Sequence, residues 1–202
     1  SLEEKIEKKR AIKQGAMQEL LRPREGWEEK KIESIVKIST GSRNTQDKVD
    51  DANYPFFVRS KNVEKIDSYS FDCEAVLTAG DGVGTGKIFH YVNGKFEVHQ
   101  RVYVMNEFKE NLDGYYFYLY FRNNFYKRIM QMTAKSSVDS VRREMIADML
   151  IPLPPKKEQI RIATILSDMD AELEQLEQKL AKYRRVKQGL MQQLLMGKTR
   201  VV

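Results

Sequence analysis

Hydrophobic residues recur with helical spacing along the last quarter of the chain. After IPLPP (151–155), apolar positions follow one another at spacings of three and four: Leu166, Met169, Leu173, Leu176, Leu180, Tyr183, Val186, Leu190 and Leu194. This heptad-like stripe is typical of a helix that packs side by side with another helix. Pro155 suits a first helical position, and Gly197 is the next residue that could end the helix. We therefore predict one helix over 155–196 that needs a partner to cover its stripe.

The first twenty residues repeat the end of this helix. LEEKIEKKRAIKQGAMQELL (2–21) and LEQKLAKYRRVKQGLMQQLL (176–195) are identical at twelve of twenty positions, at a constant offset of 174. The apolar stripe of the first copy is formed by Leu2, Ile6, Ile12, Ala16 and Leu20. Two copies are too few for a solenoid, so they indicate a matched pair of helices around one domain. We expect antiparallel pairing of 2–21 with about 157–176, leaving the stripe from Gln178 onward exposed.

Between the helices the pattern changes to short β-type runs. The runs at 35–40, 54–60, 74–79, 87–92 and 95–105 predict strands, and Asn93-Gly94 predicts a hairpin between the last two. Residues 111–132 predict a helix and 140–149 a further short helix. The sequence therefore predicts an α+β fold: a curved mixed β-sheet with packed helices (26–154), flanked by an N-terminal helix (1–25) and a long C-terminal coiled-coil helix (155–202).

The charge is unevenly distributed. The formal net charge is +6, yet residues 26–150 carry 18 basic and 18 acidic residues and are neutral overall. Within them, residues 122–143 hold six basic residues against Asp139 alone. This local excess indicates either a directed patch for nucleic acid or a solvated helix face.

Cysteine content and hydropathy limit the possible cellular compartments of the chain. A single cysteine, Cys73, excludes a disulfide framework within the chain and fits the reducing cytoplasm. No apolar run approaches the roughly 20 residues of a membrane helix, and no secretory signal is visible. The chain opens at Ser1 inside a helical pattern, so we expect a piece of a longer protein or a half-length subunit.

The segment GDGVGTGK (80–87) is the strongest candidate for a nucleotide site, and it fails both tests. A Walker A loop needs a glycine where Asp81 stands and a hydroxyl residue where Ile88 stands, and the dinucleotide fingerprint lacks its third glycine. A strand-like run follows, so no helix N-terminus faces a phosphate. The segment is either a plain turn between strands or a loop whose bare amides approach a DNA phosphate.

Other chemistry-bearing residues are few. His90 and His99 are the only histidines, and with one cysteine they make no zinc site. His99-Gln100-Arg101 offers donors for base edges and phosphates. No nuclease motif and no amino-methyltransferase tetrapeptide is present, so we predict no catalytic residues, no metal ligands and no cofactor in this chain.

The C-terminal region resembles a known family. IPLPPKKEQIRIATILSDMDAELEQLEQKLAKYRRVKQGLMQQLLMGKTR (151–200) is similar to the conserved region of specificity subunits of type I restriction–modification enzymes, and KRAIKQGAMQELL (9–21) resembles the end of the matching region. Residues 26–150, with PFFVRSKNV and TAGDGVGTGKIFHYVNGKFEVHQRVYVM, resemble one target recognition domain of that family.

The resemblance implies a non-catalytic subunit that directs DNA methylation and restriction in the cytoplasm. Double-stranded DNA, modification subunits that bind S-adenosylmethionine, and a motor subunit that uses ATP and Mg²⁺ are the implied partners. The other half of the subunit, or a second copy, would pair through the coiled coil. Two rival functions remain: a coiled-coil scaffold whose α+β domain binds protein, and an enzyme with an unfamiliar site.

The predicted DNA-binding residues are polar or basic residues, or glycines, near the ends of predicted strands, where loops carry function. They are Arg43, Asn44, Arg59, Lys61, Gly82, Gly84, Thr85, Lys87, Gln100, Arg101, Ser136, Ser137 and Arg142.

Overall fold

The computed structural model of the chain describes residues 1–133 and 140–195. The chain divides into two compact units: Pro23–Arg161, here called the α+β unit, and Ser1–Arg22 with the chain from Ile162 onward, here called the helical unit. Each is described by itself. Ser136, Ser137 and Gly197 lie outside the described residues.

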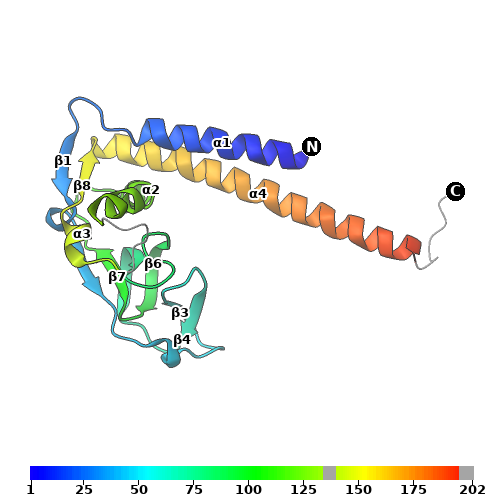
Figure 1. Cartoon of the computed structure of the whole chain (residues 1–202), viewed down its shortest axis with the longest axis horizontal. Coiled ribbons are helices and arrows are strands. Elements are labelled where there is room, and N and C mark those ends of the chain that lie inside the picture. Colours follow the sequence, from blue (N-terminus) through cyan, green and yellow to red (C-terminus); the bar gives the residue numbers. More distant parts are fainter. Residues whose placement is uncertain (134–139, 196–202) are drawn as a thin grey trace. The chain divides into compact units, whose positions relative to one another are not determined.

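In its described residues the α+β unit contains eight strands, two complete helices and the beginning of α4 (Lys156–Leu195) (Figure 1). The strands and complete helices are β1 (Glu28–Lys31), β2 (Lys37–Thr40), β3 (Tyr54–Phe57), β4 (Val63–Ile66), β5 (Phe71–Ala79), β6 (Phe89–Val98), β7 (Val102–Asn106), α2 (Gly114–Met132), α3 (Arg143–Ala147) and β8 (Leu150–Leu153), with short 3-10 turns at Ile32–Ser34 and Thr45–Asp47. The predicted α+β class is confirmed.

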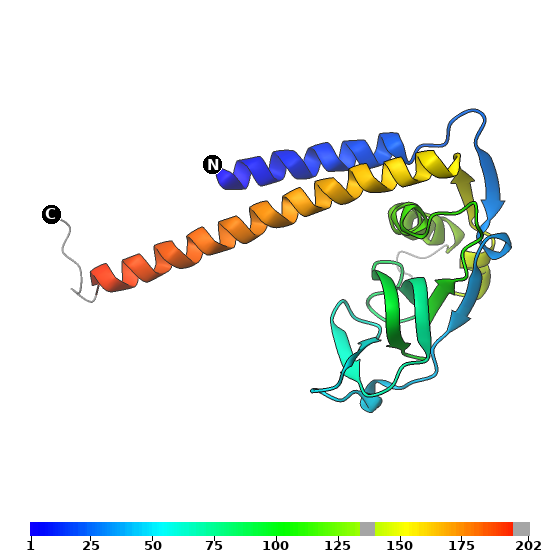
Figure 2. The ribbon, with the colours of Figure 1, turned by 180° about the vertical axis from the view of Figure 1, so that it is seen from behind.

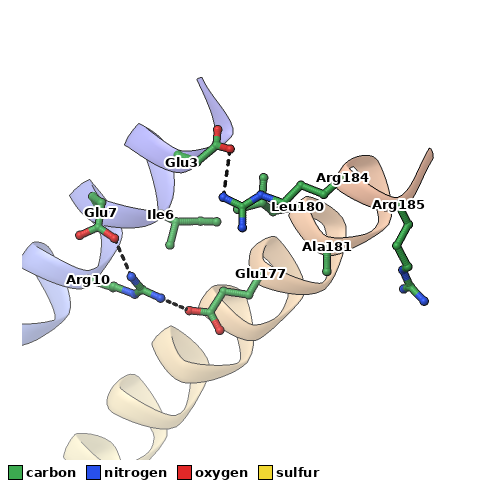
Figure 3. Close-up of a pocket in the computed structure, with 9 residues that line it drawn as sticks. All are labelled: Glu3, Ile6, Glu7, Arg10, Glu177, Leu180, Ala181, Arg184 and Arg185. Carbon is green, nitrogen blue, oxygen red and sulfur yellow. Dashed lines mark hydrogen bonds and ion pairs between the residues drawn. The ribbon is translucent and has the colours of Figure 1, made fainter. Parts of the chain in front are cut away.

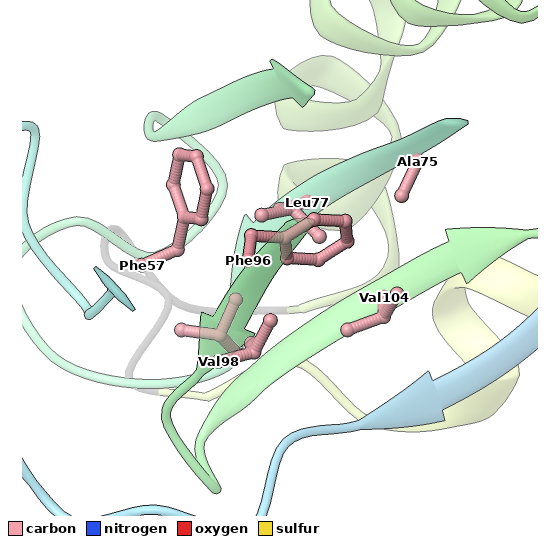
Figure 4. Close-up of a cluster of buried hydrophobic side chains, with 7 residues drawn as sticks. Phe57, Ala75, Leu77, Phe96, Val98 and Val104 are labelled. Atoms are coloured by element: carbon pink, nitrogen blue, oxygen red, sulfur yellow. The ribbon is translucent and has the colours of Figure 1, made fainter. Parts of the chain in front are cut away.

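Six strands form one mixed sheet in the order β2-β7-β5-β6-β3-β4. Its described pairs are antiparallel except β3 with β6, which is parallel. Phe57 of β3 meets Phe96 of β6 edge to face, at 5.8 Å between ring centroids. Together with Leu77, Val98 and neighbouring aliphatic side chains they form a buried cluster of the sheet (Figure 4).

Helix α2 packs against β5 and β6. Asp113 caps it, because its carboxylate accepts a hydrogen bond from Tyr116 N (2.8 Å), two positions beyond the first residue of the helix. Phe121 and Phe125 are fully buried, and both meet Phe89 of β6 edge to face. The predicted helix within 111–132 is confirmed, and the structure shows that its aromatic residues form a buried face.

The predicted hairpin at Asn93-Gly94 is wrong. Both residues lie inside β6, opposite Glu74 and Cys73 of β5. Gly94 has a φ of +127°, so it supplies the left-handed backbone conformation within the strand without a turn. The chain reverses instead at His99–Arg101, between β6 and β7, in the middle of the predicted strand 95–105.

The sequence also misses three short strands, and two of them pair with each other. Residues Glu28–Lys31 of β1 pair antiparallel with Leu150–Leu153 of β8, so the chain enters and leaves the unit side by side. β1 is charged and exposed throughout, and β8 contains Pro152, so neither has an alternating pattern.

The first turn of α4 (Lys156–Leu195) is fastened to the loop before α2. The buried Gln159 accepts from Asp113 N (2.8 Å) and donates to the carbonyls of Asn111 (2.9 Å) and Pro154 (2.8 Å). Lys156 donates to the carbonyls of Glu110 and Leu112. These hydrogen bonds of Lys156 and Gln159, here called the clasp, hold the start of α4 to the loop before α2 within the α+β unit.

The helical unit pairs α1 (Leu2–Leu20) with α4, antiparallel (Figures 1 and 2). Ion pairs join Lys13 to Asp170, Lys9 to Glu172, Arg10 to Glu177 (2.7 Å) and Glu3 to Arg184 (3.4 Å), and Figure 3 shows the last two. The predicted long helix is confirmed over Lys156–Leu195, and so is the antiparallel direction.

The predicted register of this pair is wrong by about two turns. The contacts reach Arg184 rather than stopping near residue 176, and Leu180 is half-buried instead of exposed. Ile6 is buried, whereas Ile12 is 51% exposed. Six positions rotate a helix by about 240°, which takes Ile12 off the face of Ile6. Lys9 and Lys13 occupy the stripe there, and their charges pair with carboxylates of α4.

Beyond Leu180 the stripe of α4 is exposed, as predicted. Tyr183, Val186, Leu190 and Leu194 are each between 43% and 55% exposed. The remaining predicted pairing residues, Leu2, Ala16, Leu20, Leu166, Met169, Leu173 and Leu176, are half-buried or buried.

Candidate nucleic-acid interface

The turn between β6 and β7 presents Gln100 and Arg101 to solvent. His99 is buried and holds this turn: its Nδ1 accepts from Arg101 N (3.0 Å), and its backbone N–H donates to Phe57 O (2.9 Å). Burial, followed by the charge of Arg59, lowers the pKa of His99 below its ordinary value. The ring is therefore neutral near pH 7, as its acceptor role requires.

The loop after β2 lies against this turn. Gln100 N donates to Arg43 O (2.9 Å), and the Gln100 side-chain amide donates to Asn44 Oδ1. Arg43 donates to Ser68 Oγ (3.0 Å) and lies 3.6 Å from the buried Glu97 carboxylate. The loop can approach so closely because a Cβ at Gly41 would lie 1.9 Å from Val98 O.

Asp81 joins two arginines from different loops. Its carboxylate accepts from Arg59 (2.8 Å) and lies 3.7 Å from the guanidinium of Arg101. Its backbone forms a bridge with Ser140. A groove of about 580 Å³ opens beside it, lined by Thr40, Gly80, Asp81, Gln100, Arg101, Tyr103, Ser140, Val141, Arg142 and Arg143. Asp81 is the only carboxylate among the described residues that line this groove, called here the arginine groove.

A second groove, of about 760 Å³, is lined in part by Arg59 and is called here the glycine-turn groove. Its lining combines basic and apolar side chains around the glycine-rich turn: Thr45, Val58, Arg59, Ser60, Lys61, Glu64, Gly82, Val83, Gly84, Lys87 and Ile88. Gly82 and Gly86 have φ values of +82° and +67°, which favour glycine. At its tip Val83 is fully exposed.

Thr85 and Lys87 of this turn have different environments. Thr85 is buried, and its hydroxyl donates to Gly82 O (2.6 Å), so this side chain supports the turn and does not face solvent. Lys87 Nζ lies 5.2 Å from the centre of the Tyr126 ring, which holds its charge beside the groove.

Apart from the buried Thr85, the structure brings the described candidate residues together in one connected surface. Gln100, Arg101 and Arg142 line the arginine groove, and Arg59, Lys61, Gly82, Gly84 and Lys87 line the glycine-turn groove. Arg43 and Asn44 are hydrogen-bonded to Gln100. Asp81, Tyr103 and Arg143 were missed by sequence reasoning. The one available signal was Asp81, the only acidic residue within GDGVGTGK.

The other singled-out residues have structural environments. His90 Nε2 lies 3.3 Å from Ser60 O, and burial lowers its pKa. Cys73 is half-buried and accepts from Asn106 Nδ2. Among residues 1–133 and 140–195, no three His, Cys, Asp or Glu side chains are grouped to hold a metal ion. In the same residues no helix has the length and hydrophobicity needed to cross a bilayer.

A known family matches the part of the chain that carries both grooves. The model of the type I restriction modification DNA specificity domain matches residues 24–182. The chain belongs to this family. The match covers the whole α+β unit after Pro23, with both grooves, and the part of α4 up to Lys182.

The named relatives are also specificity subunits of type I restriction systems. The EcoDI specificity subunit of a type I restriction enzyme from Escherichia coli is 33% identical over 165 residues, which is 78% of this chain and 36% of that protein. The type I restriction–modification S subunit from M. genitalium has a TM-score of 0.76 at 12% identity, over 96% of this chain and 55% of that one. The HsdS subunit from Thermoanaerobacter tengcongensis has a TM-score of 0.64 at 15% identity, over 95% and 52%.

The two structural likenesses establish the fold of the specificity domain rather than its residue roles. The chain spans between a third and about half of these relatives.

Proposed function

We propose that this chain recognises a DNA sequence as one half of a type I restriction–modification specificity subunit. The α+β unit reads one part of a split DNA site, and the helical unit docks modification subunits. The methyl donor S-adenosylmethionine, ATP and Mg²⁺ then belong to partner subunits, and the chain itself has no catalytic role.

The connected surface around Asp81 is the observation that carries this proposal. Arginine and glutamine side chains from three loops meet there, on turns fixed by backbone hydrogen bonds. Arg bonds guanine and Gln bonds adenine through two hydrogen bonds in the major groove, and a good pair contributes about 1–3 kcal/mol of discrimination. Arginines held in place lose less freedom on binding than mobile ones.

The two grooves have different expected roles. Gln100 and Arg101 project from a turn fixed by His99, which suits contact with base edges. Lys61 and Lys87 flank a turn of bare glycine amides, which suits phosphate contact. The experiment therefore changes one residue from each groove.

Lys87→Ala and Arg101→Ala would be compared in the presence of the modification subunit, against a pool of random duplexes. Lys87→Ala is expected to weaken all sequences alike and to reduce the salt dependence, whereas Arg101→Ala is expected to relax one base position. Lys30→Ala in the exposed strand β1 is the matched control. A parent chain that selects no sequence from the pool would refute the proposal.

A further inference from the structure

Glu97, the second-last residue of β6, is completely buried although it carries a carboxylate. Burying a charged group is costly unless hydrogen bonds and an opposite charge replace the water that it loses. The two carboxylate oxygens accept hydrogen bonds from Ser70 Oγ (2.7 Å) and from Val98 N (3.0 Å). Hydrophobic residues in place of a buried ion pair are often neutral or stabilising, so packing alone does not account for this carboxylate.

The opposite charge comes from Arg43, in the loop after β2. Arg43 Nε lies 3.6 Å from the Glu97 carboxylate, and this nitrogen is itself buried and has no hydrogen-bond partner among the described residues. Another nitrogen of the guanidinium donates to Ser68 Oγ (3.0 Å). Less than half of the Arg43 side chain is exposed (43%). The loop is therefore held by its side chain to the buried end of β6.

The backbone of Arg43 is attached to the same end of β6. Arg43 N donates to Val98 O (3.4 Å), and Arg43 O accepts from Gln100 N (2.9 Å) in the turn between β6 and β7. A residue fixed by both its backbone and its side chain has little freedom to move. The contact with Glu97 therefore helps to set where the loop after β2 lies against this turn.

Asn44, the next residue of the loop, contacts the side chain of Gln100. The Gln100 amide donates to Asn44 Oδ1, and Asn44 N donates to Asp47 Oδ2 (2.8 Å) at the start of a 3-10 turn. A primary amide can donate twice and also accept. Gln100 can therefore bond Asn44 and still offer the acceptor and donor that the major-groove edge of adenine requires. The place of Asn44 determines the direction in which the exposed Gln100 side chain faces.

We propose that Glu97 is a positioning residue for sequence recognition, and that it acts through Arg43 on the amide of Gln100. The inference rests on the proposed function, since it assumes that Gln100 contacts a base. The charge of Arg43 is then used within the protein and not on a DNA phosphate. A reading side chain that is held in place by a buried ion pair loses less freedom on binding and tolerates fewer wrong bases.

This support is separate from that of His99. The His99 ring accepts from Arg101 N (3.0 Å), and this bond shapes the turn without involving the loop after β2. Removing the charge of Glu97 should therefore leave the turn formed and free the direction of Gln100.

Glu97→Gln is the central variant of the test. The amide keeps the size of the side chain and can still bond Ser70 and Val98, but it loses the charge that faces Arg43. Sequences are selected from a pool of random duplexes in the presence of the modification subunit. Gln100→Ala identifies the base position that Gln100 reads. Glu97→Gln is expected to reduce discrimination at that same position roughly tenfold and to leave the other positions as in the parent.

Ser70→Ala is the matched control, because it removes another hydrogen bond of the same buried carboxylate and leaves Arg43 in place. It should lower the midpoint of urea unfolding, yet its selected sequence should remain that of the parent. Arg43→Ala should relax the same position as Glu97→Gln with the salt dependence of binding unchanged. A phosphate contact by Arg43 would instead reduce the salt slope by about one. Arg43→Lys, which keeps a positive charge beside Glu97, should recover part of the discrimination.

Several results would overturn the inference while the proposed function stands. They are a Glu97→Gln variant that selects the parental sequence, equal loss of discrimination at every position, and a reduced salt slope for Arg43→Ala. If Glu97→Gln does not fold, the two Arg43 variants decide by the same criteria. A parent chain that selects no sequence refutes the proposed function and this inference with it.

Discussion

At the scale of single residues, Asp81 is the unusual member of the proposed DNA surface. A carboxylate repels phosphate, yet this one lies between Arg59 and Arg101. It fixes two guanidinium groups and offsets their charge, so it favours directed contacts over general attraction to DNA.

Asp81→Asn is therefore expected to strengthen binding to random duplexes severalfold and to reduce discrimination between sequences by roughly tenfold, the equivalent of one base contact. Competition binding at two salt concentrations measures both effects. Asp148→Asn, which breaks an exposed pair with Lys31, is the control for loss of one negative charge. Equal weakening on all sequences would assign Asp81 a purely structural role.

His99 gives a residue-scale prediction about pH. Its folded-state pKa is lowered by burial, below the 6.5 of a free imidazole. Between that lowered pKa and pH 6.5 the unfolded chain binds more protons, so the free energy of unfolding should decrease as pH falls below about 6.5. The buried His90 shifts in the same direction.

Urea unfolding at about pH 7.5 and about pH 5.5 measures this loss, because most carboxylates titrate lower. His99→Asn keeps an acceptor near Arg101 N and removes the proton site, so the pH-dependent loss should shrink. His90→Asn measures the other share. If the loss is unchanged in both variants, the histidines do not cause it.

That most of the candidate side chains are exposed was predictable, because polar and basic residues at strand ends remain on the surface. Their pairing was not. Arg59, Asp81 and Arg101 lie on three different loops, and only the order of strands in the sheet brings those loops together.

At the scale of elements, long periodic patterns were predicted well and short strands poorly. The 40-residue α4 and the aromatic helix α2 each carry enough repeats to define a buried face. Asn93-Gly94 misled the prediction because a local turn preference was overridden by eight residue pairs between β5 and β6. β1 and β8 stabilise each other and have no distinctive pattern alone.

The clasp around Gln159 gives the element-scale prediction. Gln159→Ala would leave Asp113 N and the carbonyls of Asn111 and Pro154 without their partner inside the protein. Each buried group left unsatisfied costs about 1–3 kcal/mol, so we expect a loss of roughly 2–4 kcal/mol in the free energy of unfolding after partial relaxation. Lys157→Ala, an exposed neighbour, should change it by less than about 0.5 kcal/mol. Chemical denaturation of both variants decides whether the motif is structural.

At the scale of the whole molecule, the repeat showed that two helices pair but could not give their register. The prediction assumed that α1 lies beside the start of α4, whereas ion pairs at Lys9 and Lys13 replace apolar contacts and the pair extends to Arg184. A stripe marks apolar positions only, so charged residues within the contact face are invisible to it.

The last prediction concerns what the chain does alone and with a partner. The family match covers a specificity domain and part of one long helix. Purified alone, the chain should neither methylate nor cleave DNA, nor hydrolyse ATP. Mixed with a modification subunit and S-adenosylmethionine, it should direct adenine methylation to one sequence. Arg101→Ala should broaden that sequence at one position, because under the proposed function the modification subunit supplies the chemistry and this chain the choice of site. Transfer of tritiated methyl groups to parent and variant target duplexes measures the effect. Methylation by the chain without any partner would contradict the division of labour.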